Sequence, residues 1–304
     1  MPVEISEIRL GARKVNFSNV DKVFYPKTKF TKGQLIRYYY EISSYVLPHL
    51  KDRPLTLKRY PNGVEGEHFY EKRCPKFKPE WIKTARVYSN RHEGDIFYCM
   101  VNDLASLMWV ANLADLELHT SLSKFKNMSN PTMMMFDLDP GAGMTILDCC
   151  RVALLLKKLL RKVNLESFAK TSGSKGLQVC VPLNTKTSYE ETKSFSRAVA
   201  ELMSREHPDL VIAQMAKVLR ERKVFIDWSQ NDEYKTTVCV YSLRAMETPT
   251  VSAPLQWSEV QRGLRSGDPG SLVFDPDKIL SRAKKYGDLF GPLETMKQVL
   301  PKFG

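Results

Sequence analysis

The chain has 304 residues, and its 43% apolar content is enough for a hydrophobic core in one large domain or two closely packed ones. Its 46 Lys and Arg residues exceed its 34 Asp and Glu residues by 12, which favours a polyanion such as nucleic acid over a neutral metabolite, although a basic surface that serves solubility alone is the alternative. The sequence shows neither a signal-peptide pattern at its start nor an apolar run of about 18 residues, so we expect a cytoplasmic protein that does not enter a membrane.

The first predicted helix follows a loop that carries lysines. Residues 31–34 have the pattern of a capping box, and the apolar spacing after them predicts a helix that ends near Pro48. Asn19, Lys22 and Lys32 lie around the loop that leads into this helix. Backbone amides and the helix dipole attract anions at a helix start, so a terminal phosphate would fit there. A solvated lysine-rich surface is the alternative.

A strand and a second helix are predicted next. Residues 53–60 alternate as a strand does and are followed by a Pro-Asn-Gly turn. Phe69 and Tyr70 are an aromatic pair in a polar neighbourhood that could stack on bases, although packing in a core is the commoner fate. The apolar-rich segment 105–118 predicts a helix. His119 after it could bring an imidazole near an acidic site or serve as a structural histidine.

Two carboxylates one residue apart end the following predicted strand. Asp137 and Asp139 come after a run of large apolar residues and before a Pro-Gly turn. Because residues i and i+2 of a strand project the same way, the two carboxylates would repel each other unless a divalent cation such as Mg²⁺ or Mn²⁺ bound them. Asp227 repeats the pattern after the strand predicted at 222–228, so three acids could hold two cations. A D-x-D pattern alone is more often a turn cap or a surface acid pair.

The rest of the chain alternates helices and strands. Helices are predicted from Thr145 to about Lys162 and after Ser188, each with a capping residue. The Gly and hydroxyl loop at 171–176 could offer a phosphate its amides, a hydroxyl and Lys175, although a plain hairpin turn fits equally well and the Walker spacing is absent. Arg244 ends a strand and could contact triphosphate oxygens or form a surface ion pair.

The order of these elements and the cysteines bound the fold. Strands and helices are mixed without a regular βαβ rhythm, which indicates an α+β fold of mixed sheets flanked by helices. We expect one domain over 1–304, with residues to about 120 binding a DNA end and about 121–304 forming the catalytic core. The six cysteines have no C-x-x-C spacing, and most lie in apolar runs, so neither zinc nor a disulfide is expected.

Five segments together resemble the polymerase domain of bacterial DNA ligase D and its stand-alone relatives, a group within the archaeo-eukaryotic primase superfamily. They are residues 19–26, 53–61, 136–140, 172–177 and 226–231. The likeness covers nearly the whole chain in the right order. It implies a template-directed nucleotidyltransferase of non-homologous end joining that extends primer 3′ ends at gaps and double-strand breaks, prefers ribonucleotides and works well with Mn²⁺.

The resemblance also implies roles for individual residues. Asp137, Asp139 and Asp227 would bind two Mn²⁺ or Mg²⁺ ions, with His119 near the reacting centre. The incoming NTP or dNTP would be contacted by Lys58, Ser172, Lys175, Gln230 and Arg244. A downstream 5′-phosphate would be held by Asn19, Lys22 and Lys32, and Phe69 and Tyr70 would stack on the template strand.

Two features of the sequence qualify this resemblance. Many relatives have His where this chain has Gln178, and an amide can donate a hydrogen bond but cannot carry a proton at neutral pH. The sequence has no K-x-D-G ligase signature, so the sealing of the break is expected to come from a separate chain or from a portion beyond this sequence. The partner Ku is expected to be a separate chain. The alternatives are a primase that starts chains without a primer, a non-catalytic scaffold that binds DNA ends, and a metal-dependent nuclease.

Overall fold

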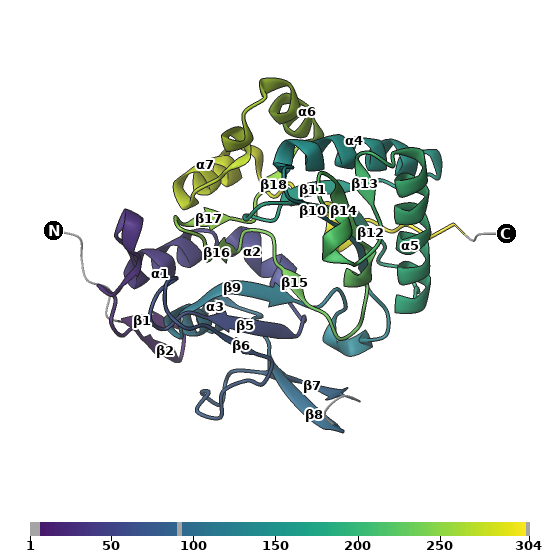
Figure 1. The fold of residues 1–304 in the computed structure, drawn as a ribbon. Helices are drawn as coiled ribbons and strands as arrows, with labels where there is room; N and C mark the ends of the chain where they lie inside the picture. Colours follow the sequence, from purple (N-terminus) through teal and green to yellow (C-terminus); the bar gives the residue numbers. More distant parts are fainter. Residues whose placement is uncertain (1–6, 90–92, 302–304) are drawn as a thin grey trace.

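The computed structural model describes residues 7–89 and 93–301. Two six-stranded sheets with helices on their outer faces form the body, as Figure 1 shows. Sheet A has the strand order β13-β14-β10-β12-β11-β18, and sheet B has the order β15-β9-β5-β8-β7, with β6 paired to β5. Antiparallel pairs dominate both sheets, and β13 and β14 are parallel. The predicted α+β class is confirmed.

The strands have the following bounds. Sheet A contains β10 (Met133–Pro140), β11 (Phe168–Thr171), β12 (Leu177–Pro182), β13 (Val211–Ile212), β14 (Val224–Asp227) and β18 (Pro254–Leu255). Sheet B contains β5 (Leu55–Arg59), β6 (Phe69–Glu71), β7 (Thr84–Ser89), β8 (Gly94–Cys99), β9 (Asp115–Thr120) and β15 (Thr237–Val238). Three small pairs are β1 (Glu7–Leu10) with β2 (Arg13–Asn16), β3 (Val23–Tyr25) with β4 (Phe30–Thr31), and β16 (Leu243–Arg244) with β17 (Thr250–Val251).

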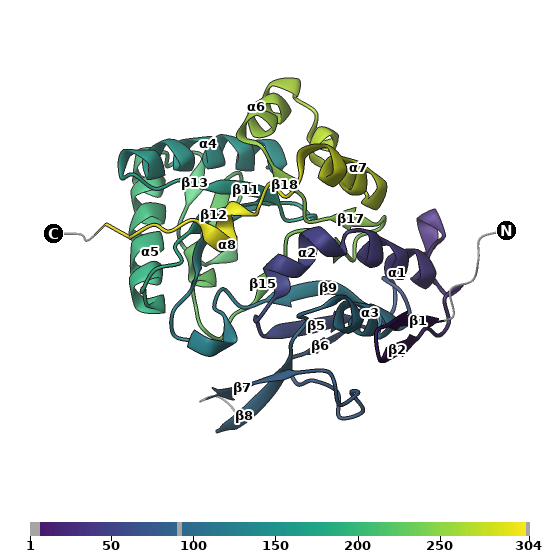
Figure 2. The same cartoon turned by 180° about the vertical axis from the view of Figure 1, so that it is seen from behind.

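The helices cover the sheets from outside. They are α1 (Lys32–Glu41), α2 (Ser43–Leu50), α3 (Leu104–Asn112), α4 (Ile146–Lys162), α5 (Tyr189–Glu206), α6 (Trp257–Ser266), α7 (Pro276–Tyr286) and α8 (Pro292–Thr295). Helices α4 and α5 contact β10 of sheet A, and α3 contacts β9 of sheet B. Figure 2 shows the same arrangement from behind, with α1 to α3 beside sheet B. Most buried side chains of the two sheets belong to one continuous hydrophobic cluster, and Ala85, Ile96 and Tyr98 of β7 and β8 belong to a second, smaller one.

The predicted helix starts are confirmed, but the first helix is shorter than expected. Thr31, Thr145 and Ser188 each close a capping box with the residue three positions later. The helix predicted to end near Pro48 is instead two helices, α1 and α2, that meet at Ile42, and Pro48 lies inside α2. Proline removes one helical hydrogen bond, and burial of the side chains around it outweighs that loss.

The helix predicted over 105–118 was wrong in its second half. Helix α3 ends at Asn112, and Ala114, with φ of 62°, turns the chain into β9. Four consecutive residues of β9, Asp115 to Leu118, are buried, because the strand lies between β5 and β15. Residues 115–119 do alternate polar and apolar side chains, but they follow almost directly on the apolar run of α3, so the two segments together resembled one longer helix. His119 is therefore a strand residue.

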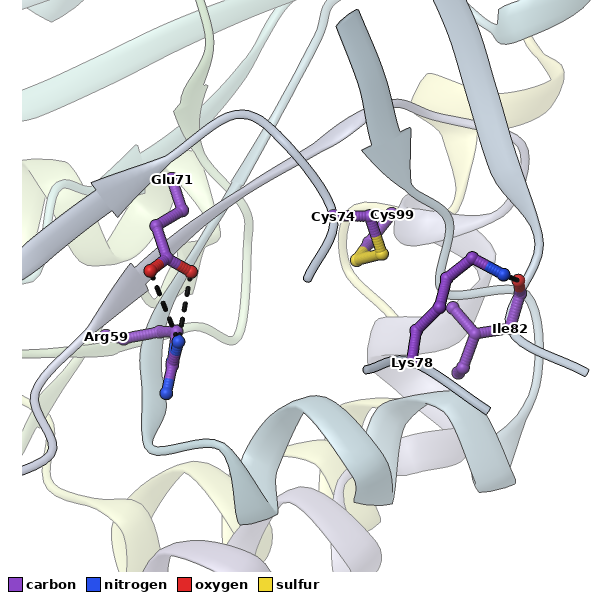
Figure 3. Close-up of a disulfide and its surroundings, with 6 residues drawn as sticks. All are labelled: Arg59, Glu71, Cys74, Lys78, Ile82 and Cys99. Atoms are coloured by element: carbon purple, nitrogen blue, oxygen red, sulfur yellow. Dashed lines mark hydrogen bonds and ion pairs between the residues drawn. A yellow bond between two sulfur atoms is a disulfide. The ribbon is translucent and has the colours of Figure 1, made fainter. Parts of the chain in front are cut away.

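The expectation that no disulfide forms was also wrong. Cys74 and Cys99 form one, across 25 residues of sequence, and Figure 3 shows it joining the segment after β6 to the end of β8. Cys74 lies in a polar stretch without a cysteine motif, so only the pairing of β5 with both β6 and β8 brings the two together. Cys149, Cys150, Cys180 and Cys239 are free and buried, as expected for thiols in apolar runs.

Among the described residues, no helix is both long and apolar enough to cross a membrane.

Candidate active site and phosphate pocket

A row of polar side chains crosses sheet A at the end of the acid strand. Lys170 on β11 pairs with Gln178 on β12, and Gln178 pairs with Asp137 on β10. Asp137 pairs in turn with Asp227 on β14. Directly paired residues share one face of a sheet, and Asp139 lies on that face two residues beyond Asp137. The fold therefore brings all three predicted acids to one face of sheet A.

The negative charges of these acids make one another's ionisation less favourable. Burial, reinforced by the charges of Asp139 and Asp227, raises the pKa of Asp137 to about 7, although Gln178 acts against the shift. Burial and the charge of Asp227 likewise raise the pKa of Asp139, while Arg220 opposes the change. A divalent cation would relieve this repulsion, and hard carboxylate oxygens are the donors that Mg²⁺ and Mn²⁺ prefer. The donor chemistry at Asp137 and Asp139 fits such an ion.

Asp227 uses its carboxylate differently. Its Oδ1 accepts a hydrogen bond from the Ser229 amide at 2.9 Å, and its Oδ2 accepts one from Gln230 Nε2 at 3.3 Å. Within residues 7–89 and 93–301, no three His, Cys, Asp or Glu side chains converge into a complete metal site. Strand pairing thus places Asp227 next to Asp137, and the binding of metal ions by all three acids stays a prediction.

Glu117 is the centre of a buried ionic cluster that the sequence patterns did not indicate. Its Oε2 lies 2.9 Å from His119 Nε2 and 3.3 Å from Arg244 Nε, and its Oε1 lies 3.2 Å from Lys58 Nζ. Oε1 also accepts the Ala245 amide at 3.0 Å. The side chain of Glu117 is only 2% exposed. One carboxylate thus orients three of the predicted catalytic or nucleotide-binding side chains.

The charges in this cluster fix the protonation of its members. Burial alone would raise the pKa of Glu117, but the hydrogen bond from His119 and the charges of Arg244, His119 and Lys58 outweigh it and hold the pKa far below its usual range. Burial lowers the pKa of His119, and Glu117 acts against that shift. Near neutral pH Glu117 is therefore an anion, and His119 is mainly neutral. Only the alternation of β9 could have indicated Glu117, because it shares a face with His119.

The loop between β11 and β12 is built around Ser172. The Ser172 hydroxyl accepts hydrogen bonds from the amides of Ser174 at 3.2 Å and Gly176 at 3.1 Å, so its own proton remains available to a ligand. Arg244 Nη1 donates to the Ser172 carbonyl at 2.6 Å. A Cβ at Gly176 would lie 2.3 Å from the Leu138 carbonyl oxygen, so glycine is required for this close approach to the acid strand. Lys175 is exposed at the tip of the loop.

A cavity of about 370 Å³ collects most of the predicted catalytic and nucleotide-binding residues. Seven of them line it: His119, Asp137, Asp139, Ser172, Lys175, Gln230 and Arg244. Gln178 and Arg220 line it too, and Arg220 was not predicted because it lies far along the chain in a charged loop without a motif. Lys58 is joined to the cavity through Glu117, and Asp227 through its pairing with Asp137. Acidic and basic groups thus face one chamber.

The three predicted phosphate ligands meet at the start of α1. The Lys32 amide donates to the Lys22 carbonyl at 2.8 Å, and the Lys22 amide donates to the Asn19 carbonyl at 3.1 Å. Lys22 Nζ binds Asn62 Oδ1 at 2.8 Å. Lys32 Nζ donates to the Ser18 carbonyl at 2.6 Å. The loop therefore brings Asn19 and both lysines to one helix N-terminus.

The electrostatics of this pocket suit an anion. Lys32 is 5% exposed, and burial, together with the charges of Lys22 and Arg59, lowers its pKa to about 8. Arg59 is a third cation of the pocket that sequence reasoning missed, although it adjoins the predicted Lys58. Three cations that destabilise one another become favourable when a phosphate binds between them.

The predicted aromatic pair lies on the surface. Phe69 and Tyr70, on β6, are 46% and 49% exposed, so they are not core residues. The Tyr70 ring meets His119 edge-on at 5.8 Å between centroids, and its hydroxyl bonds Thr236 Oγ1 at 2.8 Å. The pair borders the candidate active site and presents ring area to solvent, as a stacking platform does.

Three comparisons show which known proteins the chain is similar to. A family model described as "LigD, primase-polymerase domain" matches residues 31–290. The multifunctional non-homologous end joining protein LigD of Mycolicibacterium smegmatis is 38% identical over 95% of the chain and 37% of its own length. The bifunctional protein LigD of Bacillus subtilis is 35% identical over 90% of the chain and 43% of its own length.

A solved structure, the polymerase domain of Mycobacterium tuberculosis ligase D in complex with DNA, superposes with a TM-score of 0.86 at 35% identity. The match covers 93% of this chain and 99% of that domain. The chain spans less than half the length of the curated relatives above, and nearly all of the solved domain.

Proposed function

Because the chain belongs to the family of LigD primase-polymerase domains, we propose that it is a template-directed nucleotidyltransferase that extends primer 3′ ends at gaps and double-strand breaks in non-homologous end joining. The observation that carries the proposal is the shared cavity, where the Asp137–Asp139 pair faces Arg244 and Lys175. Paired acids beside cations match a reaction in which a hydroxyl is activated and a polyphosphate is bound.

Each residue of the cavity has a task in this reaction. Arg244 and Lys175, with the free hydroxyl proton of Ser172, would bind the triphosphate and stabilise the charge that develops on it. Gln230 and Lys58 would complete the nucleotide contacts. Neutral His119, whose Nε2–H is directed at Glu117, could accept the proton of the primer 3′-hydroxyl at Nδ1. Base pairing with the template would select the nucleotide, while the protein grips phosphates.

Asp137 and Asp139, together with Asp227, would hold the Mn²⁺ or Mg²⁺ ions. Such ions make an attacking hydroxyl more acidic and neutralise a leaving pyrophosphate.

The DNA side of the proposal rests on the pocket at α1. Asn19, Lys22 and Lys32 would bind the 5′-phosphate at the far side of a gap, and Phe69 and Tyr70 would stack on the template. Ku and a DNA ligase activity would act with the enzyme to align and seal the break.

The deciding experiment is extension of a labelled primer on a gapped duplex with a 5′-phosphate, with each NTP and dNTP under Mn²⁺ and under Mg²⁺. One or a few added nucleotides support the proposal. Shortened primers would indicate a nuclease, and product from single-stranded template and nucleotides alone would indicate a primase. An unchanged primer under every condition would contradict the proposal and leave an end-binding scaffold.

The phosphate pocket gives a second test. Lys22→Ala and Lys32→Ala are each expected to remove the preference for a gap with a 5′-phosphate over one with a 5′-hydroxyl, because each loses a charge next to the anion. The measurement is the ratio of the Kd values for the two duplexes. Lys284→Ala, an exposed lysine on α7, is the matched control. An equal loss of affinity for both duplexes would refute the pocket.

The depressed pKa of Lys32 predicts a pH effect in the same assay. The ammonium group is charged below about pH 8 and neutral above it, so preference for the 5′-phosphate should fall as the pH rises from 7 to 9.5. Lys32→Arg keeps its charge over this range and should show a flat profile. A wild-type preference that does not change with pH would contradict the assignment of Lys32.

A further inference from the structure

A second, larger cavity lies beside the candidate active site. Its volume is about 1000 Å³, and one bank is formed by residues 72–77, which we call the strap. Asp232, Tyr234 and Lys235 also line the cavity, as do Ile96 and Tyr98 of β8. We call this cavity the strap groove. None of the predicted site residues except Tyr70 lines it.

The strap groove is basic. Its lining has five cations and two carboxylates: Arg59, Lys72, Arg73, Lys76 and Lys235 against Glu71 and Asp232. Arg59 binds both oxygens of Glu71, at 3.0 and 3.2 Å, as Figure 3 shows. Asp232 is paired with Lys193, which lies outside the lining, at 2.7 Å. Both acids are therefore neutralised, and the lining keeps an excess of positive charge for a polyanion.

Exposed aromatic rings alternate with these cations. Tyr70, Phe77 and Tyr234 are 49%, 69% and 41% exposed, respectively, and all three line the groove. Exposure of the Phe77 ring to water is unfavourable, and the ring lies between Lys76 and Lys78 rather than in a hydrophobic patch. Rings interleaved with cations are the pattern of surfaces that stack bases and follow a phosphate backbone.

The strap is held in place on both sides. The Cys74–Cys99 disulfide joins it to β8, and the Cys74 amide donates to the Phe97 carbonyl at 2.7 Å. Lys72 Nζ reaches across the groove to the Tyr234 carbonyl at 3.0 Å. Figure 3 shows the disulfide in the same view as Arg59 and Glu71 of the lining. A loop without regular structure thus presents fixed cations and rings.

The position of the groove identifies which strand it would receive. Arg59 lines the groove and also acts on Lys32 of the phosphate pocket. Tyr70 lines the groove and also contacts His119 of the catalytic cavity. The groove therefore connects the two sites, and between a 5′-phosphate and a primer end the only nucleic acid is the unpaired template.

We propose that the strap groove binds the single-stranded template DNA of a gap, with bases stacked on Phe77 and Tyr234 and phosphates on the strap cations, and that the Cys74–Cys99 disulfide maintains this geometry. The inference rests on the proposed function. It adds a binding surface and a redox dependence that the catalytic proposal does not require.

The test measures affinity for end-labelled duplexes that carry a 5′-phosphate and a 3′ template overhang of zero, four or eight nucleotides, by fluorescence anisotropy without nucleotides. Wild-type affinity is expected to rise with overhang length. Phe77→Ala should lose roughly tenfold in affinity for the longest overhang and little for the blunt duplex, because only a stacked base is lost. Tyr40→Ala removes an exposed aromatic residue on α1, outside the groove, and is the matched control.

The outcomes separate the parts of the proposal. Wild-type overhang dependence in Phe77→Ala would overturn the groove, while primer extension by the wild type would still support the polymerase. Reduction of the wild type with dithiothreitol, or Cys74→Ser, should weaken overhang binding severalfold and leave blunt-duplex binding unchanged. Overhang binding that survives reduction would overturn the role of the disulfide. Circular dichroism of Cys74→Ser shows whether its fold is intact.

Discussion

Primer extension by Asp137→Ala is expected to fall by roughly 10³-fold or more, while its affinity for gapped DNA stays within a few fold of wild type. Asp137 lies at the centre of the row that crosses sheet A, and it lines the catalytic cavity with Asp139. The phosphate pocket and the strap groove do not contain it. Steady-state extension rates and anisotropy with the same gapped duplex measure the two quantities.

A readout without catalysis accompanies this prediction. Asp137→Asn keeps the shape of the side chain and removes one of the charges that oppose each other, so its melting temperature in EDTA should equal or exceed that of the wild type. Addition of Mn²⁺ should raise the melting temperature of the wild type more than that of the variant, because binding to the native state stabilises it. Retained synthesis by Asp137→Ala, or equal Mn²⁺ stabilisation of both proteins, would remove the metal assignment.

Glu117→Gln is expected to lower kcat/KM for nucleotide addition by roughly 10²-fold, because Arg244, Lys58 and His119 lose the anion that orients them. Removing the partner of buried cations should also cost about 3 kcal/mol of unfolding free energy. Glu117 holds the pKa of His119 up against burial, so its loss should move the acidic limb of the kcat/KM profile to lower pH. A merely structural role would leave that profile in place.

The matched control is Glu259→Gln. Glu259 of α6 forms a largely buried pair with Arg282 of α7, and neither residue lines the cavity. That variant should lose stability and keep wild-type kcat/KM. If both variants lose activity in proportion to stability, Glu117 has no special role in positioning.

Patterns among a few neighbouring residues predicted the helix starts and the acid strand. Capping boxes gave the starts of α1, α4 and α5, and the D-x-D pattern after an apolar run gave the acid strand. The family resemblance rested on such segments, and the comparisons confirm it. The proximity of Asp227 to Asp137 followed from reading both as strand ends, and the register places them directly opposite.

Contacts between distant segments were beyond these patterns. The apolar run of α3 hid β9 inside an apparent helix, and with it the alignment of Glu117 and His119. The Cys74–Cys99 pair and the role of Arg59 both depend on β5 lying between its neighbours. Whether a cysteine or arginine finds a partner is decided by sheet topology, which a single sequence does not show.

Strand β5 carries the two halves of the candidate site on adjacent residues. Lys58 pairs with Glu117 of the buried ionic cluster. Arg59 follows a shift in register, lines the strap groove and acts electrostatically on Lys32. On the proposed roles, one strand fixes the distance between two contacts, because no hinge separates the residue near the downstream 5′-phosphate from the residue that contacts the incoming nucleotide. In a longer gap the additional template nucleotides would have to bend out of the space between these two contacts. The enzyme would therefore select its substrate by gap length independently of the template sequence.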